Sequence, residues 1–193
     1  MTLRADLCSL GLDTSCYTTS VALVDGGGLV YDGRTPLEVS PGAVGLRQSD
    51  AVFQHVRNAP GLIEEAMRTA RQRGLRVAAA GASAWPRRTR GSYMPVFLAG
   101  SGLARAVSAA LGAPYIEVSH QEGHIAAASW SSELGIARRG GFLALHLSGG
   151  TTELLAVHDR TNVELLGGTE DLNAGQFIDR VGVRLGIPFP AGP

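Results

Sequence analysis

Apolar and polar residues alternate along the first thirty residues, in short runs separated by turn-forming residues. A period of two is typical of half-buried β-strands. The predicted strands cover residues 7–13, 18–24 and 29–31, and the glycines at 26–28 form the turn between the second and the third. The chain therefore begins with a predicted antiparallel meander.

After the meander, apolar residues recur three and four positions apart. This spacing predicts one or two helices over residues 46–73, interrupted near Pro60 because proline has no amide hydrogen. Further strands are expected at 76–84 and 115–118, and further helices at 96–111 and 120–134. Strands that alternate with helices imply a sheet with parallel members.

The pattern begins again after an arginine- and glycine-rich run at residues 137–141. Strands are predicted at 142–147, 151–157 and 163–166, followed by a helix from about 174 to 185. A meander followed by a helix therefore occurs twice. We predict two lobes, residues 1–136 and 137–193, with the second lobe incomplete in this chain.

Composition narrows the class of protein. With 193 residues, 45% hydrophobic and 18% charged, the chain is globular and not disordered. All 17 basic residues are arginine, so lysine Schiff-base chemistry and a lysine-containing phosphate loop are excluded. The net charge is zero, so any contact with nucleic acid must be local.

The sequence also predicts a compartment. Two cysteines are too few for a disulfide scaffold, no signal peptide is recognisable, and no apolar run reaches the roughly 20 residues of a membrane span. We expect a cytoplasmic protein without a membrane partner.

Two turns could hold phosphates. Asp13, Thr14 and Ser15 end the first strand of the first lobe, and the turn at 148–152 ends the first strand of the second lobe. A single glycine-rich turn is weak evidence, but two equivalent turns can present backbone N–H groups to one nucleotide. This arrangement is that of a duplicated actin-like nucleotide fold.

His120 and His124 are four residues apart, so on a helix both rings project from one face and can share a metal ion. The alternative is two ordinary surface histidines. A helical zinc protease needs glutamate directly after the first histidine, where this chain has Gln121. No side chain is recognisable as a covalent nucleophile, so no catalytic residue is assigned.

One basic cluster has aromatic neighbours. Its members are Trp85, Arg87, Arg88, Arg90 and Tyr93. Such a cluster can contact a phosphate backbone or can be a plain exposed loop. The sequence alone favours the loop.

Several of these segments together resemble one known family, that of the tRNA threonylcarbamoyladenosine transferases, formerly called O-sialoglycoprotein endopeptidases. The matching segments are 10–16, 119–124, 147–152, 174–179 and 190–193, with His55, Val56 and Arg57 in the first long helix. The segments at 46–49 and 91–95 resemble a bacterial paralogous branch of that family more closely.

The resemblance implies an α/β, actin-like (ASKHA) fold made of duplicated ribonuclease-H-like lobes. It implies transfer of threonylcarbamoyl from threonylcarbamoyl-adenylate to N6 of the adenosine next to the anticodon of tRNA. His120 and His124 would bind one divalent metal, iron or zinc. The residues that would contact the adenylate, or ATP, are His146, Leu147, Ser148, Gly149, Gly150, Asp179 and Gly192. Expected partners are tRNA, a degenerate paralog or a second copy, and other proteins of the pathway.

The chain also departs from the family pattern. Tyr17, Thr18, Leu172 and Gln176 stand where the family has acidic residues, and Trp85–Arg88 replaces a Gly-Pro-Gly turn. The alternative hypothesis is therefore a noncatalytic paralog that serves as a dimerisation scaffold or regulator. Tyr17 and Leu172 favour this alternative, whereas the histidine pair and the glycine-rich turn favour the enzyme. If the chain is cut from a longer protein, we expect an exposed apolar edge where the rest of the second lobe would pack, and with it dimerisation or poor solubility.

Overall fold

The computed structural model describes residues 6–40, 45–132, 141–159 and 162–192. Contacts divide the chain into two compact units: unit 1 is residues 1–39 and 45–123, and unit 2 is residues 40–44 and 124–193. The lobe boundary predicted at residues 136 and 137 lies outside the described residues and stays a prediction.

Unit 1 contains one five-stranded mixed sheet. Its strands are β1 (Leu7–Asp13), β2 (Thr18–Asp25), β3 (Leu29–Pro36), β4 (Arg76–Trp85) and β5 (Tyr115–Ser119), in the order β3-β2-β1-β4-β5. The predicted meander pairs antiparallel, and β4 runs parallel to both β1 and β5. The expected sheet with parallel members is therefore confirmed.

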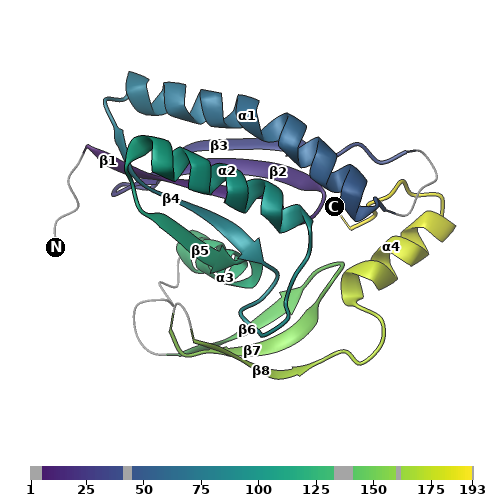
Figure 1. Cartoon of the computed structure of the whole chain (residues 1–193). Helices are drawn as coiled ribbons and strands as arrows, with labels where there is room; N and C mark the ends of the chain where they lie inside the picture. Colours follow the sequence, from purple (N-terminus) through teal and green to yellow (C-terminus); the bar gives the residue numbers. More distant parts are fainter. Residues whose placement is uncertain (1–5, 41–44, 133–140, 160–161, 193) are drawn as a thin grey trace. The chain divides into compact units, whose positions relative to one another are not determined.

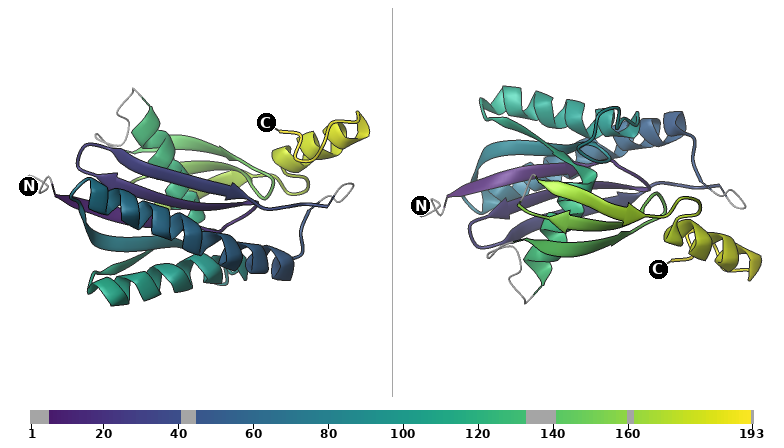
Figure 2. Two further views of the ribbon diagram at one scale, coloured as in Figure 1. Left: turned by 90° about the horizontal axis from the view of Figure 1, so that it is seen from above. Right: turned by 90° about the horizontal axis from the view of Figure 1, so that it is seen from below.

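The helices α1 (Gln48–Gln72) and α2 (Val96–Leu111) pack against the same face of this sheet (Figures 1 and 2). The core lies between helices and sheet because the strands alternate: Cys8, Leu10 and Leu12 of β1 are buried, whereas Ser9 and Gly11 are exposed. Four of the five buried residues of α1 are alanines, which lets the helix approach the sheet closely. Its buried residues are Ala51, His55, Ala59, Ala66 and Ala70.

The interruption predicted near Pro60 is wrong, because α1 is one continuous helix through this residue. Pro60 lies on the exposed side of the helix. The carbonyl of Val56, which has no amide partner in Pro60, can therefore bond to water. Burial of Ala59 and Ala66 on the opposite side holds the axis against the sheet.

The third strand is longer than the apolar pattern predicts. β3 runs to Pro36 through Asp32, Gly33 and Arg34, all paired with β2. β3 is at the edge of the sheet, so the side that faces solvent takes polar residues while the backbone ladder continues.

Unit 2 repeats the first elements of unit 1. Its strands β6 (Phe142–Leu147), β7 (Thr152–Val157) and β8 (Val163–Gly168) form an antiparallel sheet in that order, and α4 (Ala174–Arg184) follows. This matches the predicted recurrence of a meander and a helix. The expected exposed apolar surface is present: Leu143, Leu145 and Leu147 of β6 are all more than half exposed.

The helix α3 (His120–Ser131) begins in unit 1 and continues in unit 2. Residues 133 and 134, predicted as its end, lie outside the described residues. None of the helices within the described ranges is both long enough and apolar enough to cross a lipid bilayer.

Candidate functional site

The carboxylate of Asp13, the last residue of β1, joins three other segments of unit 1. Its Oδ2 lies 2.5 Å from Ser83 Oγ on β4 and 2.9 Å from Nδ1 of His120, the first residue of α3. Its Oδ1 accepts a hydrogen bond of 2.8 Å from the backbone N–H of Ser15. Because β1 and β4 are parallel neighbours, their carboxyl ends lie at one edge of the sheet and bring Asp13 and Ser83 together.

The protonation of this cluster follows from the charge of Asp13. Burial raises the pKa of Asp13, but the hydrogen bond and positive charge of His120, and the bonds from Ser15 and Ser83, hold it well below its ordinary value. Near neutral pH Asp13 is therefore ionised and can only accept hydrogen bonds. Nδ1 of His120 must carry the proton that joins them. In a neutral ring the lone pair is then on Nε2, the tautomer in which a carboxylate-bound histidine coordinates metals.

The first turn of α3 is closed by a reciprocal cap. Ser119 Oγ accepts the backbone N–H of Glu122 at 3.1 Å, and the Glu122 carboxylate accepts the backbone N–H of Ser119 at 2.6 Å. Arg88 donates to the same carboxylate at 2.7 and 3.2 Å. The cap fixes where the helix begins, and so it fixes the position of His120.

In unit 2, the ring of His124 lies 5.2 Å from that of His146, measured between centroids. His146 is on β6, one residue before the end of the strand, and its Nδ1 is 3.4 Å from Thr151 Oγ1. His124, a candidate metal ligand, thus lies next to His146, which the family resemblance assigns to the adenylate. In the part of the chain that the structure describes, no three His, Cys, Asp or Glu side chains are grouped closely enough to hold a metal ion.

The glycine-rich turn after β6 is organised by the side chain of Ser148. Its Oγ accepts the backbone N–H groups of Gly150 and Thr151 at 3.1 and 3.0 Å, and Leu147 before it is exposed. A phosphate bound by these two amides would have to replace Ser148 Oγ as their acceptor.

The same turn packs against the start of α4. The backbone N–H of Gly175 donates to the carbonyl of Ser148 at 3.1 Å, and a Cβ on Gly175 would lie 2.6 Å from the backbone nitrogen of Gly149. Only glycine fits at Gly175 without displacing the turn.

The equivalent turn after β1 connects this strand to α2. Thr14 is buried; its Oγ1 donates to the carbonyl of Val96 at 2.7 Å and accepts the backbone N–H of Gly100 at 3.0 Å. This ties β1 to α2. The placement of Asp13, Thr14 and Ser15 near a phosphate stays a prediction.

Asp179 and Gly192 are thirteen residues apart in the sequence, and the structure brings their segments together. Asp179 Oδ1, on α4, accepts the backbone N–H of Ala191 at 2.8 Å. Gly182 allows this close approach, because a Cβ at Gly182 would collide with the Cβ of Ala191. The final segment therefore folds back onto α4, and places Gly192 one residue from the contact.

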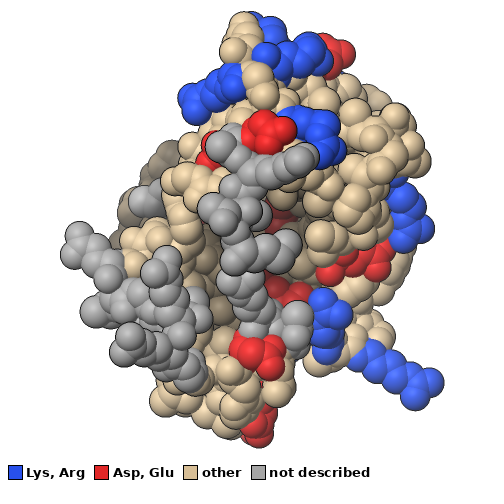
Figure 3. All heavy atoms as spheres, turned by 90° about the vertical axis from the view of Figure 1, so that its left-hand side faces the viewer, with Lys and Arg blue, Asp and Glu red and all other residues tan. Residues whose placement is uncertain are grey.

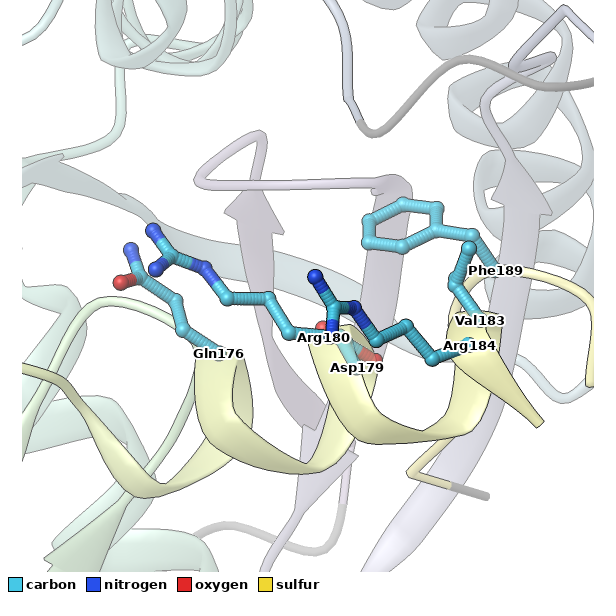
Figure 4. A pocket seen from close by; sticks show the side chains of 6 residues that line it. All are labelled: Gln176, Asp179, Arg180, Val183, Arg184 and Phe189. Carbon is cyan, nitrogen blue, oxygen red and sulfur yellow. The ribbon is translucent and has the colours of Figure 1, made fainter.

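A hollow of about 460 Å³ opens beside this contact (Figure 4). Gln176, Asp179, Arg180, Val183 and Arg184 of α4 line it, together with Phe189 of the returning segment. Figure 4 shows the long side chains of Gln176, Arg180 and Arg184 extending along one side of the helix. Two guanidinium groups and an aromatic ring suit an anionic ligand with a planar base. A volume of this size accommodates a small molecule.

Sequence reasoning missed Ser83, Glu122 and the link from Glu122 to Arg88. Ser83 had a signal, because it is the only polar residue between Arg76 and Trp85, the two ends of β4, in a run that is otherwise small and apolar. Ser119 and Glu122 have the spacing of a capping box, which could have been recognised directly. The partnership with Arg88 had no sequence signal, because 34 residues separate it from Glu122.

Solved structures with a similar fold place the chain in a class. YeaZ from Pseudomonas aeruginosa aligns with a TM-score of 0.50 at 17% identity, over 87% of this chain and 68% of that one. The ROK hexokinase from Thermus thermophilus aligns with a TM-score of 0.52 at 17% identity, over 94% of this chain and 65% of that one. At these identities the likeness concerns the fold alone, and it confirms an α/β fold of the actin-like class.

Sequence comparison is more specific. The model of the family described as tRNA N6-adenosine threonylcarbamoyltransferase matches residues 42–193. The protein of that name from Thermus thermophilus is 37% identical over 194 residues, 95% of this chain and 54% of its own length. The one from Geobacillus kaustophilus is 33% identical over 193 residues, 99% of this chain and 54% of its own length. The chain therefore belongs to the tRNA N6-adenosine threonylcarbamoyltransferase family, and it spans about half the length of these relatives.

Proposed function

We propose that this chain carries the adenylate-binding and metal-binding part of an enzyme that transfers threonylcarbamoyl to tRNA. In the proposed reaction N6 of the adenosine next to the anticodon attacks the carbamoyl carbon of threonylcarbamoyl-adenylate. A bond from that carbon to N6 forms, the bond to the phosphate oxygen breaks, AMP leaves and N6 loses one proton. Family membership supports this reaction.

We place the protein in the cytoplasm, because the free thiols of Cys8 and Cys16 suit a reducing compartment.

The observation that carries the proposal is the contact between Asp179 and Ala191. Asp179 and Gly192 are two of the seven residues that the family resemblance assigns to the adenylate. The hydrogen bond to Ala191 holds their segments together beside the hollow on α4, which has the size and the cationic lining for a nucleotide.

His120 and His124 would hold the metal. They are one helical turn apart on α3, and imidazole suits both iron and zinc, so the residues fit as two of its ligands. When bound, the metal would polarise the carbamoyl oxygen. Asp13 would keep the ring of His120 in the tautomer that coordinates through Nε2.

Nucleotide binding tests the adenylate site. AMP and ATP are titrated by calorimetry into the wild type and into Asp179→Ala and Gly182→Ala. We expect each variant to weaken binding at least tenfold, the first by releasing Ala191 and the second by displacing it. The controls are Asp171→Ala, an exposed acid before α4, and Gly167→Ala, where an added Cβ meets nothing within 4 Å. Equal binding by variants and controls would remove the adenylate site from α4.

Metal content and transfer test the rest of the proposal. Elemental analysis of the wild type should give about one iron or zinc per chain, with loss in the double variant of His120→Ala and His124→Ala. His158→Ala is the control, because His158 is an exposed histidine paired with Glu164 at the surface. Transfer is followed as radiolabelled threonine in tRNA, with threonylcarbamoyl-adenylate as donor. A metal-loaded wild type that labels no tRNA would contradict the proposed reaction.

One observation favours the noncatalytic alternative. Leu143, Leu145 and Leu147 present an exposed apolar row on β6, which suits a partner protein or a second copy of this chain. The scaffold hypothesis predicts a stable dimer in size-exclusion chromatography and no bound metal. A monomer with stoichiometric metal would contradict it.

A further inference from the structure

The segment of α1 that carries part of the family resemblance takes no part in the proposed adenylate and metal sites. Its residues are His55, Val56 and Arg57. Val56 is half exposed, and Arg57 lies at the surface with its guanidinium 3.6 Å from the carboxylate of Glu38. His55 is fully buried. It is therefore the member of this segment that contacts the interior of unit 1.

The ring of His55 joins α1 to the turn after β1. Its Nε2 lies 3.2 Å from the carbonyl oxygen of Cys16, and its Nδ1 lies 2.9 Å from Thr19 Oγ1. Burial lowers the pKa of His55, so near pH 7 the ring is neutral and carries one proton. Because a carbonyl oxygen can only accept, that proton is on Nε2, and Nδ1 accepts a bond from the Thr19 hydroxyl. No other donor among the described residues reaches the carbonyl of Cys16.

The turn between β1 and β2 is thus held at three successive residues. Thr14 Oγ1 bonds to the backbone of α2 at 2.7 and 3.0 Å. The backbone N–H of Ser15 donates to Asp13 Oδ1 at 2.8 Å, and the carbonyl of Cys16 accepts from His55. A backbone has two soft torsions per residue, so the positions of neighbouring peptide groups are coupled. Release of the Cys16 carbonyl therefore allows the N–H of Ser15 to move.

The orientation of the Asp13 carboxylate depends on that N–H group. Oδ1 of Asp13 is held by Ser15, and this directs Oδ2 toward Nδ1 of His120, 2.9 Å away. If the N–H of Ser15 moves, the carboxylate can rotate away from the ring. A histidine that loses an oriented carboxylate partner also loses its single tautomer and its fixed ring orientation.

We propose that His55 is a positioning residue for His120: through the carbonyl of Cys16 it fixes the turn that orients the Asp13 carboxylate against Nδ1 of His120. The inference rests on the proposed function in one respect, because it takes His120 to be a metal ligand. The chain of contacts lies within unit 1 and does not need a bound metal. Since a ligand oriented in advance binds its metal more tightly, His55 should also affect metal affinity.

The test compares three replacements of His55. His55→Gln places an amide N–H near the position of Nε2 and can still donate to Cys16, whereas His55→Asn places its amide near Nδ1 and cannot reach Cys16. His55→Leu removes both contacts. The first readout is the ¹⁵N shifts of the His120 ring in the metal-free protein, and the second is zinc affinity, measured by competition with a chelator.

We expect His55→Gln to keep the Nδ1–H tautomer of His120 and to bind zinc within about twofold of the wild type. His55→Asn and His55→Leu should give a mixture of His120 tautomers and weaken zinc binding by about tenfold or more.

Three controls separate positioning from stability. Thr19→Val removes the other partner of the His55 ring, and Leu23→Val leaves a small cavity in the core at the middle of β2. Both should lower stability in urea unfolding. Arg71→Gln changes the surface of the same helix, in the arginine-rich region at the C-terminal end of α1, seen at the top of Figure 3. All three should keep the wild-type His120 shifts and zinc affinity.

Wild-type His120 shifts and zinc affinity in a folded His55→Asn protein would overturn the proposal, because His55 would then only join α1 to the sheet. Equal losses in His55→Asn and in the controls would overturn it as well, since the effect would then follow stability. If His55→Asn and His55→Leu do not fold, the wild type decides. The ¹⁵N shifts of its His55 ring must show the proton on Nε2, and a proton on Nδ1 would exclude the donation to Cys16 and overturn the proposal.

The two proposals fail separately. A wild type that binds no metal or transfers no threonylcarbamoyl, but whose His120 shifts respond to the His55 variants as expected, would contradict the proposed function and leave this inference in place. A wild type that binds metal and transfers threonylcarbamoyl, with unchanged His120 shifts in His55→Asn, would do the reverse.

Discussion

Asp13 Oδ2 lies 2.9 Å from Nδ1 of His120, and the two residues are 107 positions apart in the sequence. Ser83 binds the same oxygen from the neighbouring parallel strand. A carboxylate that ends the first strand thus holds the histidine that begins α3. In this position an acid controls the ring orientation and the tautomer of a histidine.

Replacing Asp13 with asparagine tests this control directly. Asp13→Asn keeps the shape but removes the charge that requires Nδ1 of His120 to carry the proton. We expect the ¹⁵N shifts of His120 to change from a dominant Nδ1–H tautomer to a mixture, and zinc affinity to fall by about 10- to 100-fold.

The control for this change is Asp32→Asn, which breaks an exposed pair with Arg34. It should leave the His120 shifts and zinc binding unchanged. Unaltered ¹⁵N shifts in a folded Asp13→Asn protein would contradict the assigned role.

Gly100 offers a test of the link between β1 and α2. A Cβ at Gly100 would lie 2.8 Å from Thr14 Oγ1, the atom that already bonds to Val96 and to Gly100. We expect Gly100→Ala to destabilise the protein by about 1–3 kcal/mol because the buried threonine must move.

Gly102→Ala is the matched control on the same helix. Gly102 is exposed, and an added Cβ there meets nothing within 4 Å. Alanine is the better helix former, so this change should stabilise the protein by about 0.5–1 kcal/mol. Urea unfolding measures both values, and a Gly100→Ala protein as stable as the control would show that Thr14 is not confined.

The elements were largely predictable from the sequence because each depends on local periodicity. Strand β1 alternates Cys8, Leu10 and Leu12 with small or polar residues, and unit 1 buries that face under α1 and α2. The helix break predicted near Pro60 is wrong because the effect of a proline on a helix depends on whether it lies on the side that faces water. The local sequence does not show which side that is. The end of β3 was predicted too early because the strand continues to Pro36 through backbone pairing with β2, which its own side chains do not indicate.

The candidate site was less predictable. Asp13 and His120 were both singled out, but for separate ligands, because nothing local shows that a residue of β1 and one of α3 are in contact. The sequence favours a plain exposed loop around Arg88; the residue does lie in an exposed loop, but its guanidinium also binds the buried carboxylate of Glu122. Tertiary contacts decide which arginines are paired with a carboxylate. The sequence alone therefore does not show which arginines are available to bind a ligand.

His55 predicts how stability depends on pH. It is fully buried in α1, with Nδ1 2.9 Å from Thr19 Oγ1 and Nε2 3.2 Å from the carbonyl of Cys16. Burial lowers the pKa of His55, and the bond to Cys16 and the charge of Asp13 only partly oppose this. Above the ordinary histidine pKa of about 6.5 the ring is neutral in both states and its contribution to stability is complete. Below it the unfolded chain binds a proton that the folded protein resists, so stability falls.

Urea unfolding between pH 8 and pH 5 should therefore show a declining free energy of unfolding in the wild type, with a slope of at most about 1.4 kcal/mol per pH unit from this group. His55→Gln should be less stable throughout but should lose this decline. His158→Gln, an exposed control, should keep it. A wild type whose stability is constant over this range would contradict the prediction.

The cap of α3 links stability to the position of the candidate metal ligand. Ser119 is fully buried, and its Oγ accepts the N–H of Glu122. Ser119→Ala leaves that donor without its partner, and we expect a loss of about 1 kcal/mol in urea unfolding. Because His120 lies inside this cap, zinc affinity should fall with it. Ser131→Ala, at the exposed end of the same helix, should change neither value. A normal zinc affinity in a destabilised Ser119→Ala protein would show that the cap supports the fold but does not position His120.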